Sequence, residues 1–458
     1  MNKNSQLDVT HYLQSVAGSK EAPQLVLGMQ SVAGCGFPRQ EAEPQKAEVE
    51  AFQSTGAVEA HLIGDDFKKV WSNHSNKWSG IALAANGKLY CSPFGASRVL
   101  RIDPATGATK LIGDEGATET AGFGINRWLG IVNRWSGIVA AADGKLYCSP
   151  SNVPRVLRID PATDATELIG DDFSALDDTG GMRAMTLWSG IAAAADGKLY
   201  CSPCTATRVL RIDPAAGTTE LIGDDFKDNG FNGIAAAADG KLYCSPYSPG
   251  SGASRVLRID PATGETELIG DDLGETCGIM AAADGKLYLP MVGGRMYRVL
   301  RIDPATGETE LIGDKRGNRV GFPLVALPDG QLLCSASAGT WATVSRMDLT
   351  TNEIKEIGAF RSSRVASYNW SGCAAAADGT LYFAPEEATR VLRIKVGLIS
   401  DEADAEHRQL QSSLDWYEWV QEGTKWVKRL TPAAAEAKKK AEEDAEAEFR
   451  EARRKETD

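Results

Sequence analysis

Short apolar runs alternate with turn residues along most of the chain. The string IVAAADGKLYCSP at 138–150 recurs almost unchanged at 191–203 and at 234–246. Each unit continues with runs of the type RVLRID and TELIG, so that it holds four short apolar runs. Ala-Asp-Gly-Lys between the first two runs and Asp-Pro-Ala-Thr-Gly-Glu-Thr between the last two are both tight-turn sequences. The pattern predicts units of four antiparallel strands joined by hairpins.

The number of repeat units follows from the number of Asn/Asp-Gly turns. The glycine of this turn occurs seven times, at Gly87, Gly144, Gly197, Gly240, Gly285, Gly330 and Gly379. Four strands per unit, repeated every 43 to 57 residues, are typical of β-propeller blades. The Ala-rich first run is too short for a stable helix and suits the crowded inner strand of a blade. We therefore predict an all-β fold, a seven-bladed β-propeller of four-stranded blades.

The order of the runs predicts how the ring closes. The first Leu-Ile-Gly run, at 62–64, precedes every other element, whereas the last unit, Trp370 to Lys395, has three runs and no fourth. We expect residues 55–64 to supply the outer strand of the last blade. An N-terminal strand in that place would remove the exposed edges of an open array.

The chain outside the repeats has a different composition. Residues 1–50 show no period and contain QSVAG twice, at 14–18 and 30–34, which predicts an irregular arm before a propeller at 51–398. Residues 399–431 form an aromatic-rich segment that we expect to pack on the propeller's flank or bottom. Four of its residues stand near helical spacing: Trp416, Val420, Val427 and Leu430.

The last part of the chain predicts a helical C-terminal extension. Thr431 and Pro432 are a typical N-cap and first helical residue. Residues 432–458 consist mainly of Ala, Glu, Lys and Arg and lack an apolar seam, so we expect a charged, solvent-exposed helix. Coiled-coil pairing is the alternative.

Composition and charge narrow the function classes. The 458 residues are 43% apolar and 24% charged, as in ordinary globular proteins. A net charge of −13 without a basic stripe argues against nucleic acid as a partner. No stretch approaches a membrane span, and the N-terminal residues lack the apolar core of a secretory signal. We expect a soluble cytoplasmic monomer that does not bind membranes.

The cysteines follow the repeat. Five of the nine occupy one repeat position: Cys91, Cys148, Cys201, Cys244 and Cys334. Equivalent positions in an array do not generally meet, so we predict buried, unpaired thiols in a reducing compartment. Cys201 and Cys204 form a C-x-x-C motif, but no helix follows it, which disfavours a redox role.

All variation in loop length falls on one face of the predicted propeller. The turns between runs one and two, and between runs three and four, are short and nearly constant. The connections between runs two and three, and from one unit to the next, differ widely, as in residues 66–77, 114–134 and 171–187. Loops on a rigid frame usually carry binding specificity, so this face is the predicted site.

Two residue sets near this face are candidates. One aromatic residue begins each of five inner strands, near the channel mouth, and could form a ligand platform: Trp78, Trp135, Trp188, Phe231 and Trp370. Wedging between blades is the alternative. Aspartate pairs follow the fourth runs, and four of these residues are candidate ligands for Ca²⁺ or Mg²⁺: Asp171, Asp172, Asp224 and Asp225. Turn capping is the alternative, because the fourth strand is outermost.

Other charged residues suggest structure rather than catalysis. Arg211 and Asp213 stand on one side of a strand, as their equivalents do in other units, and predict an ion-pair layer between blades. The four histidines share no repeat position: His11, His61, His74 and His407. We therefore assign no catalytic residue and expect no cofactor, with a divalent cation as the alternative.

The combination G-I-x-x-x-x-D-G-x-L-Y and R-V-x-R-I-D-P-x-T-G-x-T-E resembles the repeat of streptogramin-lyase-like propellers, and more loosely NHL-repeat and regucalcin/gluconolactonase-like propellers. The resemblance covers about residues 55–395. It implies the propeller fold and, in the lyase group, a histidine with acidic residues near Mg²⁺. No histidine here matches by motif position, and the inner strands are mostly Ala where gluconolactonase-like proteins hold a metal.

The sequence therefore predicts a non-enzymatic binding scaffold. Its variable loop face would bind a protein or a small ligand. A metal-dependent hydrolase or lyase of the gluconolactonase-like or streptogramin-lyase-like kind is the alternative.

Overall fold

The computed structural model describes residues 54–56, 58–67, 76–113, 134–176, 186–226, 230–247, 255–270, 273, 276, 278–291, 298–312, 324–326, 331–338, 341–361, 370–396, 417–422 and 425–430. The predicted arm at 1–50 and the predicted helix at 432–458 lie outside these residues. Within the part of the chain that is described, no helix is long and apolar enough to cross a membrane.

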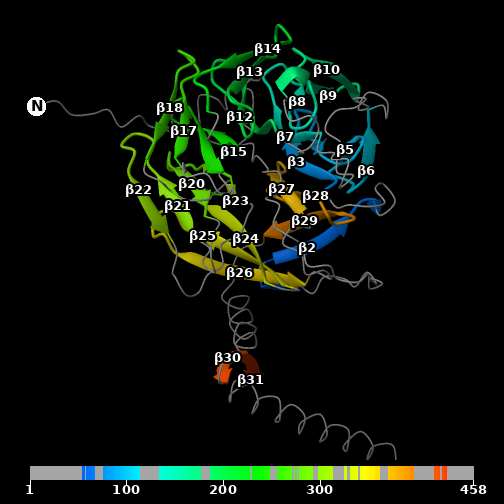
Figure 1. Ribbon diagram of the computed structural model, residues 1–458. Helices are drawn as coiled ribbons and strands as arrows, with labels where there is room; N and C mark the ends of the chain where they lie inside the picture. Colours follow the sequence, from blue (N-terminus) through cyan, green and yellow to red (C-terminus); the bar gives the residue numbers. More distant parts are fainter. Residues whose placement is uncertain are drawn as a thin grey trace, which may run out of the picture.

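Seven antiparallel sheets stand around a common axis and confirm the seven-bladed propeller (Figure 1). Blade 1 contains β3 (Trp78–Leu83), β4 (Leu89–Pro93), β5 (Val99–Ile102) and β6 (Thr109–Ile112). Blade 2 contains β7 (Trp135–Ala140), β8 (Leu146–Pro150), β9 (Val156–Asp160) and β10 (Ala165–Ile169). Blade 3 contains β11 (Trp188–Ala193), β12 (Leu199–Pro203), β13 (Val209–Asp213) and β14 (Thr218–Ile222). Blade 4 contains β15 (Gly230–Ala236), β16 (Leu242–Tyr247), β17 (Val256–Ile259) and β18 (Thr266–Ile269).

The other three blades contain the ring closure. Blade 5 contains β19 (Met280–Ala281), β20 (Leu287–Pro290), β21 (Val299–Ile302) and β22 (Thr309–Ile312). Blade 6 contains β23 (Leu324–Ala326), β24 (Leu332–Ala338), β25 (Trp341–Met347), β26 (Ile354–Arg361) and a fifth strand, β1 (Ser54–Gly56). Blade 7 contains β27 (Trp370–Ala375), β28 (Leu381–Pro385), β29 (Val391–Val396) and β2 (Val58–Ile63).

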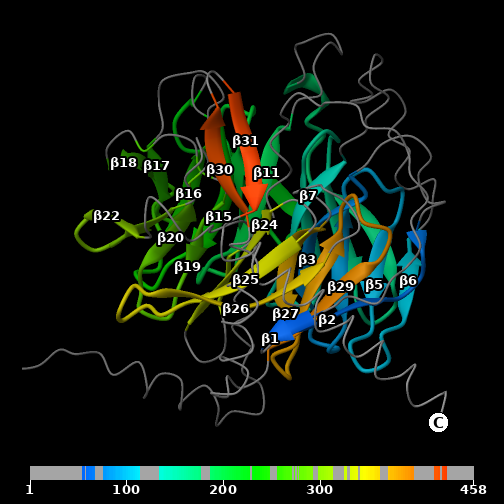
Figure 2. The same ribbon diagram turned by 90° about the horizontal axis from the view of Figure 1, so that it is seen from below.

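The N-terminal strand completes the last blade, as predicted. β2 pairs antiparallel with β29 from Val58 opposite Val396 to Ile63 opposite Val391. The predicted boundary is wrong by three residues, because Thr55 and Gly56 pair with β26 of blade 6 instead. Figure 2 shows β1 beside β26 and β2 beside β29. The start of the described chain thus joins two blades at their outer edges.

The Asp-Gly turn is built in the same way in four blades. In blade 2, Gly144 adopts a φ of 78°, which a glycine accepts without steric cost. Asp143 Oδ1 accepts from Lys145 N at 3.0 Å, and its Oδ2 accepts from Tyr147 OH at 2.7 Å. Equivalent tyrosine–aspartate bonds of 2.7 to 2.8 Å occur in blades 3, 4 and 5: Tyr200–Asp196, Tyr243–Asp239 and Tyr288–Asp284. The repeated turn therefore also fixes a buried tyrosine between blades.

Inner strands of neighbouring blades meet through a collar formed by the Trp-Ser-Gly sequences. A Cβ on Gly190 would lie 2.9 Å from Gly233 Cα, so only glycine permits this approach. The serines bridge the same seams, because Ser189 Oγ donates to Phe231 O at 2.9 Å. Corresponding bonds are Ser371 to Trp78 O, Ser79 to Trp135 O and Ser136 to Trp188 O. Blades 5 and 6 carry Thr-Cys-Gly and Gly-Phe-Pro in this place.

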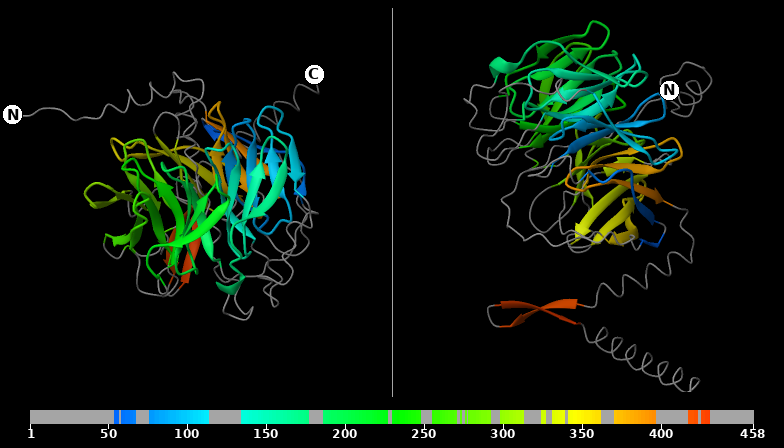
Figure 3. Two further views of the ribbon diagram at one scale, coloured as in Figure 1. Left: turned by 90° about the horizontal axis from the view of Figure 1, so that it is seen from above. Right: turned by 90° about the vertical axis from the view of Figure 1, so that its right-hand side faces the viewer.

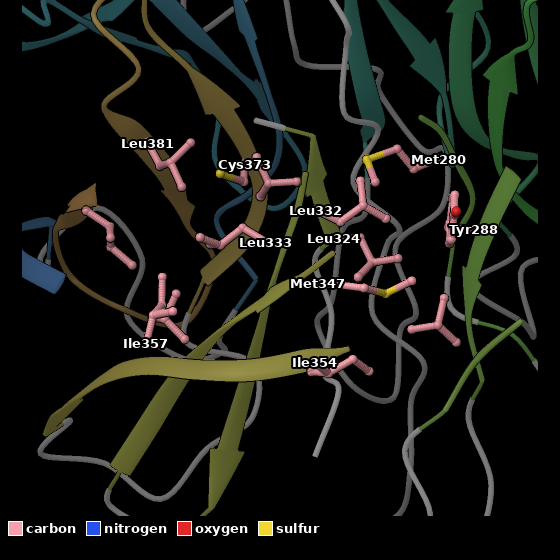
Figure 4. Close-up of a cluster of buried hydrophobic side chains, with 14 of the residues drawn as sticks. Met280, Tyr288, Leu324, Leu332, Leu333, Met347, Ile354, Ile357, Cys373 and Leu381 are labelled. Carbon is pink, nitrogen blue, oxygen red and sulfur yellow. The ribbon is translucent and has the colours of Figure 1, made fainter. Parts of the chain in front are cut away.

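Buried apolar side chains fill the space between blades. Figure 4 shows the cluster shared by blades 5, 6 and 7, in which Met280 and Met347 pack with Leu324 and Leu332. These four side chains are at most 9% exposed. Methionine adapts to irregular gaps, which suits the arc where the collar sequence is absent.

The predicted ion-pair layer between blades is wrong for most arginines. Arg211 pairs with Glu220, its cross-strand neighbour in the same blade. Arg158, Arg258 and Arg301 likewise pair with Glu167, Glu267 and Glu310 of their own blades. Asp213 lies 3.8 Å from Lys198 Nζ, also in the same blade. The directly opposite residue is simply the nearest partner for a long side chain on a sheet.

The aromatic-rich segment contains strands where helical spacing was predicted. β30 (Tyr417–Glu422) and β31 (Lys425–Leu430) form a two-stranded antiparallel sheet, drawn in red in Figure 3. The β-branched and aromatic residues of this segment favour strands, and Gly-Thr at 423–424 separates them in the sequence. Its packing against the propeller stays a prediction.

Candidate functional site

The variable face carries the connections that leave second and fourth strands. Second strands reach third strands there through residues 94–98 in blade 1, 151–155 in blade 2, 204–208 in blade 3 and 386–390 in blade 7. The opposite face carries the Asp-Gly turns and the short turns between third and fourth strands. The connections that differ in length between blades therefore lie on the variable face.

A ladder of backbone hydrogen bonds runs along this face from blade 7 through blades 1 and 2 to blade 3. In blade 2, Ser151 N donates to Arg134 O at 2.9 Å, joining the end of the second strand to the start of the first. Arg134 N donates to Phe94 O of blade 1 at 2.6 Å, so the next bond crosses the seam. The pattern continues on both sides: Lys77 N to Glu386 O (2.9 Å), Phe94 N to Lys77 O (3.0 Å), Leu187 N to Ser151 O (2.7 Å) and Cys204 N to Leu187 O (2.8 Å).

The ladder presents a different side chain at each equivalent place. The residues before the inner strand are Lys77, Arg134, Leu187 and Gly230, and those after the second strand's Ser-Pro are Phe94, Ser151, Cys204 and Tyr247. Glu386 follows Ala-Pro in blade 7, and Met291 follows Leu-Pro in blade 5. Two residues earlier, by contrast, the serine is the same in blades 1 to 4. Except at Gly230, where a Cβ would lie 2.7 Å from Tyr247 O, the backbone bonds allow different side chains at these positions. We call these ten residues the mouth rim.

Two cations of the mouth rim hold neighbouring loops. Lys77 is 7% exposed, and its Nζ donates to Glu386 O at 3.0 Å and Glu387 O at 3.2 Å. Arg134 Nη1 donates to Gly95 O at 3.0 Å and Ala96 O at 3.2 Å. A buried charge needs such partners, and each cation here uses carbonyls of the preceding blade. The loops of blades 7 and 1 are therefore fixed beside the mouth.

Apart from the buried Phe94, the mouth rim is polar in blades 7, 1 and 2 and largely apolar in blades 3 to 5. Glu386, Lys77, Arg134 and Ser151 belong to blades 7, 1 and 2. Leu187, Cys204, Tyr247 and Met291 belong to blades 3, 4 and 5, and all but Leu187 are half-buried. Ser151 Oγ is fully buried and has no hydrogen-bond partner among the described residues. Of the four polar residues only Arg134 is half-buried and the other three are buried, so the accessible rim offers one cation beside largely apolar side chains.

The predicted aromatic residues lie beneath the mouth rim. Trp78, Trp135 and Trp188 are 0% exposed and Phe231 is 1% exposed, whereas Trp370 is half-buried. Each indole Nε1 donates at 2.9 Å to an arginine carbonyl of its own blade: Arg98, Arg155, Arg208 or Arg390. Phe67 and Phe173 lie edge-on to Trp78 and Trp188, each with centroids 5.0 Å apart. These contacts favour the wedge interpretation over a ligand platform.

The predicted aspartates lie at the outer rim. Asp171 N donates to Thr219 Oγ1 of the next blade at 2.8 Å, and this hydroxyl donates back to Asp171 Oδ2 at 3.0 Å. Asp224 N makes the same bond to Thr266 Oγ1 at 3.1 Å. Asp172 accepts from Ser174 N at 2.9 Å at the start of the 3-10 helix η3 (Ser174–Leu176). Hydrogen bonds from Ser174 hold the pKa of the Asp172 carboxyl below its usual range.

Nothing near these aspartates completes a cation site in the described part of the chain. No three His, Cys, Asp or Glu side chains come close enough together there to hold a metal ion. The carboxylate of Asp171 and the backbone N–H of Asp224 bond across seams between blades, and Asp225 follows Asp224 on an exposed turn. The geometry thus supports the turn interpretation of the aspartate pairs.

The repeat cysteines are buried, as predicted, wherever their side chains are described. Cys91, Cys148, Cys201 and Cys244 are 0% exposed, and burial raises the pKa of each thiol well above its usual range. A protonated, inaccessible thiol is a poor nucleophile. Cys204 is half-buried and belongs to the mouth rim. The side chain of Cys334 lies outside the described residues, as do His11, His74 and His407; His61 is exposed on β2.

Solved structures share this fold. The sequence itself matches no protein-family model and no curated protein. A streptogramin B lyase is similar with a TM-score of 0.55 and 15% identity over 74% of this chain and 98% of the lyase. Virginiamycin B lyase from Staphylococcus aureus is similar with a TM-score of 0.51 and 14% identity, over 75% of this chain and 99% of that lyase. Hydrazine synthase from Kuenenia stuttgartiensis has a TM-score of 0.50 and 16% identity, over 72% of this chain and 98% of the synthase chain. The resemblance to streptogramin-lyase-like propellers therefore holds for the fold.

The mouth rim was not predicted from the sequence. The sequence does contain a signal for it, because most rim residues directly flank the repeated Trp-Ser and Ser-Pro sequences, at positions where the repeat units stop being identical.

Proposed function

We propose that this chain is a binding scaffold whose mouth rim and variable loops hold a protein or a small ligand. The observation that supports this is the mouth ladder, in which equivalent backbone positions carry unlike side chains. A rigid frame with position-specific side chains lowers the entropy cost of binding. The described residues supply neither a nucleophile–base pair nor a converging set of acids, so the proposal assigns no chemical step to them.

The proposal is tested by comparing what the wild type and a rim variant retain from an extract. The rim variant carries Cys204→Ala, Tyr247→Ala and Met291→Ala, and the control variant carries Lys88→Ala, Lys145→Ala and Lys198→Ala on the opposite face. We expect the rim variant to lose the bound species and the control to keep it, with both melting near the wild type. Equal retention by all three proteins would refute the proposal.

A lyase activity is the second candidate, because two of the similar structures are streptogramin-type lyases. Fold similarity at this identity does not transfer activity. The test is incubation with quinupristin or virginiamycin B in the presence of Mg²⁺, with the products followed by mass spectrometry. Turnover would favour the lyase. Stabilisation by Mg²⁺, on the order of 2.7 kcal/mol at a hundredfold excess over its dissociation constant, would accompany a built metal site.

A further inference from the structure

The fourth strand of blade 6 is longer than its counterparts. In blades 1 to 4 and in blade 7 the glycine after the fourth strand adopts a φ between 76° and 84° and ends the strand: Gly113, Gly170, Gly223, Gly270 and Gly64. Gly358 is the equivalent glycine in blade 6, but it lies within β26, which continues to Arg361. Ala359 stands where the other blades carry the aspartate of their Gly-Asp turn. The chain therefore stays extended instead of turning.

This extension is the part of β26 that accepts a fifth strand. β1 pairs antiparallel with it, Ser54 opposite Phe360, Thr55 opposite Ala359 and Gly56 opposite Gly358. β25 supports the other side of the same residues, with Thr343 opposite Ala359. No other fourth strand in the described part of the chain carries a fifth. The outer edge of Gly358–Phe360 is thus a built site for strand addition, at the border of the variable face.

The resident strand is short and has relatives in the arm. β1 has three residues, Ser-Thr-Gly, and Gln53 precedes it in the sequence. The arm repeats Gln-Ser at 14–15 and 30–31, each time followed by Val-Ala-Gly. In the register of β1, Val32 would stand opposite Ala359 and Ala33 opposite Gly358. Val32 would take the place of Thr55, and both are β-branched residues that favour strands. Ala33 would take the place of Gly56, and alanine loses less backbone entropy on ordering than glycine.

We propose that the outer edge of β26 is an exchange site, at which residues 31–33 of the same chain replace Ser54–Gly56. The occupant is the chain's own arm, because a tether keeps its local concentration high. When residues 31–33 pair with β26, residues 34–57 form the connection from this edge to β2. When Ser54–Gly56 pair with it, residue 57 alone forms that connection. The cost of closing that loop grows only with the logarithm of its length. The exchange brings a long segment to the border of the variable face and does not depend on what the mouth rim binds.

Disulfide trapping in the full chain tests the exchange. Every variant carries Cys35→Ser and Ala359→Cys, with a second cysteine at Thr55→Cys, Val32→Cys or Ala42→Cys. Directly opposite strand residues lie close enough for a disulfide. Thr55→Cys reports the resident strand, and Ala42→Cys is the matched control, because it lies nearer to β1 along the chain but outside the repeated motif. Peptide mapping identifies each bond after mild oxidation.

We expect the Thr55→Cys pair to cross-link and the Val32→Cys pair to cross-link at least fivefold faster than the Ala42→Cys pair. In the Val32→Cys protein, Thr55→Pro should raise the rate several-fold, because proline removes a donor from the resident strand. Melting temperatures check that each variant folds. Equal rates for Val32→Cys and Ala42→Cys, no response to Thr55→Pro, or bonds found only between two copies would overturn the proposal.

Discussion

Asp164 of blade 2 accepts a hydrogen bond from Arg101 of blade 1, in the turn where most other blades carry glycine. Asp164 adopts a φ of 61°, a conformation that aspartate and asparagine tolerate better than other side chains. Lys110 Nζ adds a second bond to the same oxygen at 3.0 Å. Asn352 repeats the arrangement between blades 5 and 6, with a φ of 61° and an Arg301 Nη1 bond of 2.8 Å to its Oδ1. A left-handed polar residue thus ties the third strand of one blade to the next blade.

Replacing Asp164 should separate its backbone role from its charge. We expect Asp164→Ala to lower the free energy of unfolding by about 1–2 kcal/mol, since it loses both the seam bonds and the tolerance for positive φ. Asp164→Asn should lose less, as the natural Asn352 suggests. Chemical denaturation of both variants at pH 7 measures the difference, and equal losses would contradict this division of roles.

The charge also gives a pH dependence. Burial alone would raise the pKa of the Asp164 carboxyl, but hydrogen bonds from Lys110 and Arg101 outweigh it and hold that pKa below its usual range. The folded state therefore favours the ionised form, so its contribution is complete above the unfolded pKa of about 3.9 and is lost as the pH falls through the lower folded pKa. The gap in stability between wild type and Asp164→Asn should close as the pH falls below 4. A gap that widens there would contradict this sign.

At two of the three seams between these, a glycine faces an arginine of the preceding blade and offers a gain of stability. A Cβ on Gly217 would lie 3.9 Å from Arg158 Nη1, and Gly217 has a φ of 67°. Gly217→Asn should create the bond that Asn352 already makes and raise the free energy of unfolding by about 0.5–1 kcal/mol. Gly144→Asn is the matched control, because its φ is 78° but nothing lies within 4 Å of its Cβ. If both variants show the same change, the neighbouring arginine contributes nothing.

The collar predicts that one added methyl group is costly. Gly190→Ala should lower the free energy of unfolding by about 1–3 kcal/mol, because the new Cβ would press on the backbone of Gly233. Gly190 has no positive φ, so the loss would come from packing alone. Gly197→Ala gives the converse case, with a φ of 78° and open space around it. Thermal and chemical unfolding of both variants measure these losses. A Gly190→Ala variant as stable as the wild type would contradict the predicted clash in the collar.

The buried tyrosines predict a loss of stability in alkali. Burial, followed by the hydrogen bond to Asp143, raises the pKa of Tyr147 far above its usual value, and Tyr200, Tyr243 and Tyr288 follow in the same way. The stabilising neutral form persists below the unfolded pKa of about 10, and stability falls as the pH rises beyond it. Phenolate absorbance should therefore appear together with unfolding. Tyr147→Phe should weaken this dependence, and phenolate formation in the intact fold would contradict it.

The repeated part of the fold follows from local chemistry. The Asp-Gly turn fixes its own hairpin through Asp143, Gly144 and Lys145, so a pattern read within a few residues predicts it. The last unit lacks a fourth run, and this predicted the ring closure, because the third strand of that blade needs a strand from elsewhere in the chain to pair with its outer edge. Contacts between residues far apart in the sequence were harder to predict. Arg211 could pair with a residue across its own sheet or with one across a seam, and the sequence does not decide between them. The pairing of the short β1 depends on the extended backbone at Gly358.

The candidate site was predictable as a face and not as a set of residues. Loop lengths indicated the variable face, since they differ in the sequence itself. The mouth rim depends on hydrogen bonds such as Arg134 N to Phe94 O, which join residues far apart in different units. Trp188 shows the opposite case: its position near the mouth was predicted, but its burial beneath the ladder depends on how neighbouring blades pack.

The closure of blade 7 has a consequence for synthesis on the ribosome. β2 leaves the ribosome before all other strands of its blade, yet its partner β29 begins only at Val391. At ordinary rates of about 5–20 residues per second, β2 waits roughly 15 to 65 seconds with an unsatisfied edge. During that time the six intervening blades exist as an incomplete arc. A nascent chain of this kind exposes two unpaired ends to chaperones or to neighbouring chains until its final strand arrives.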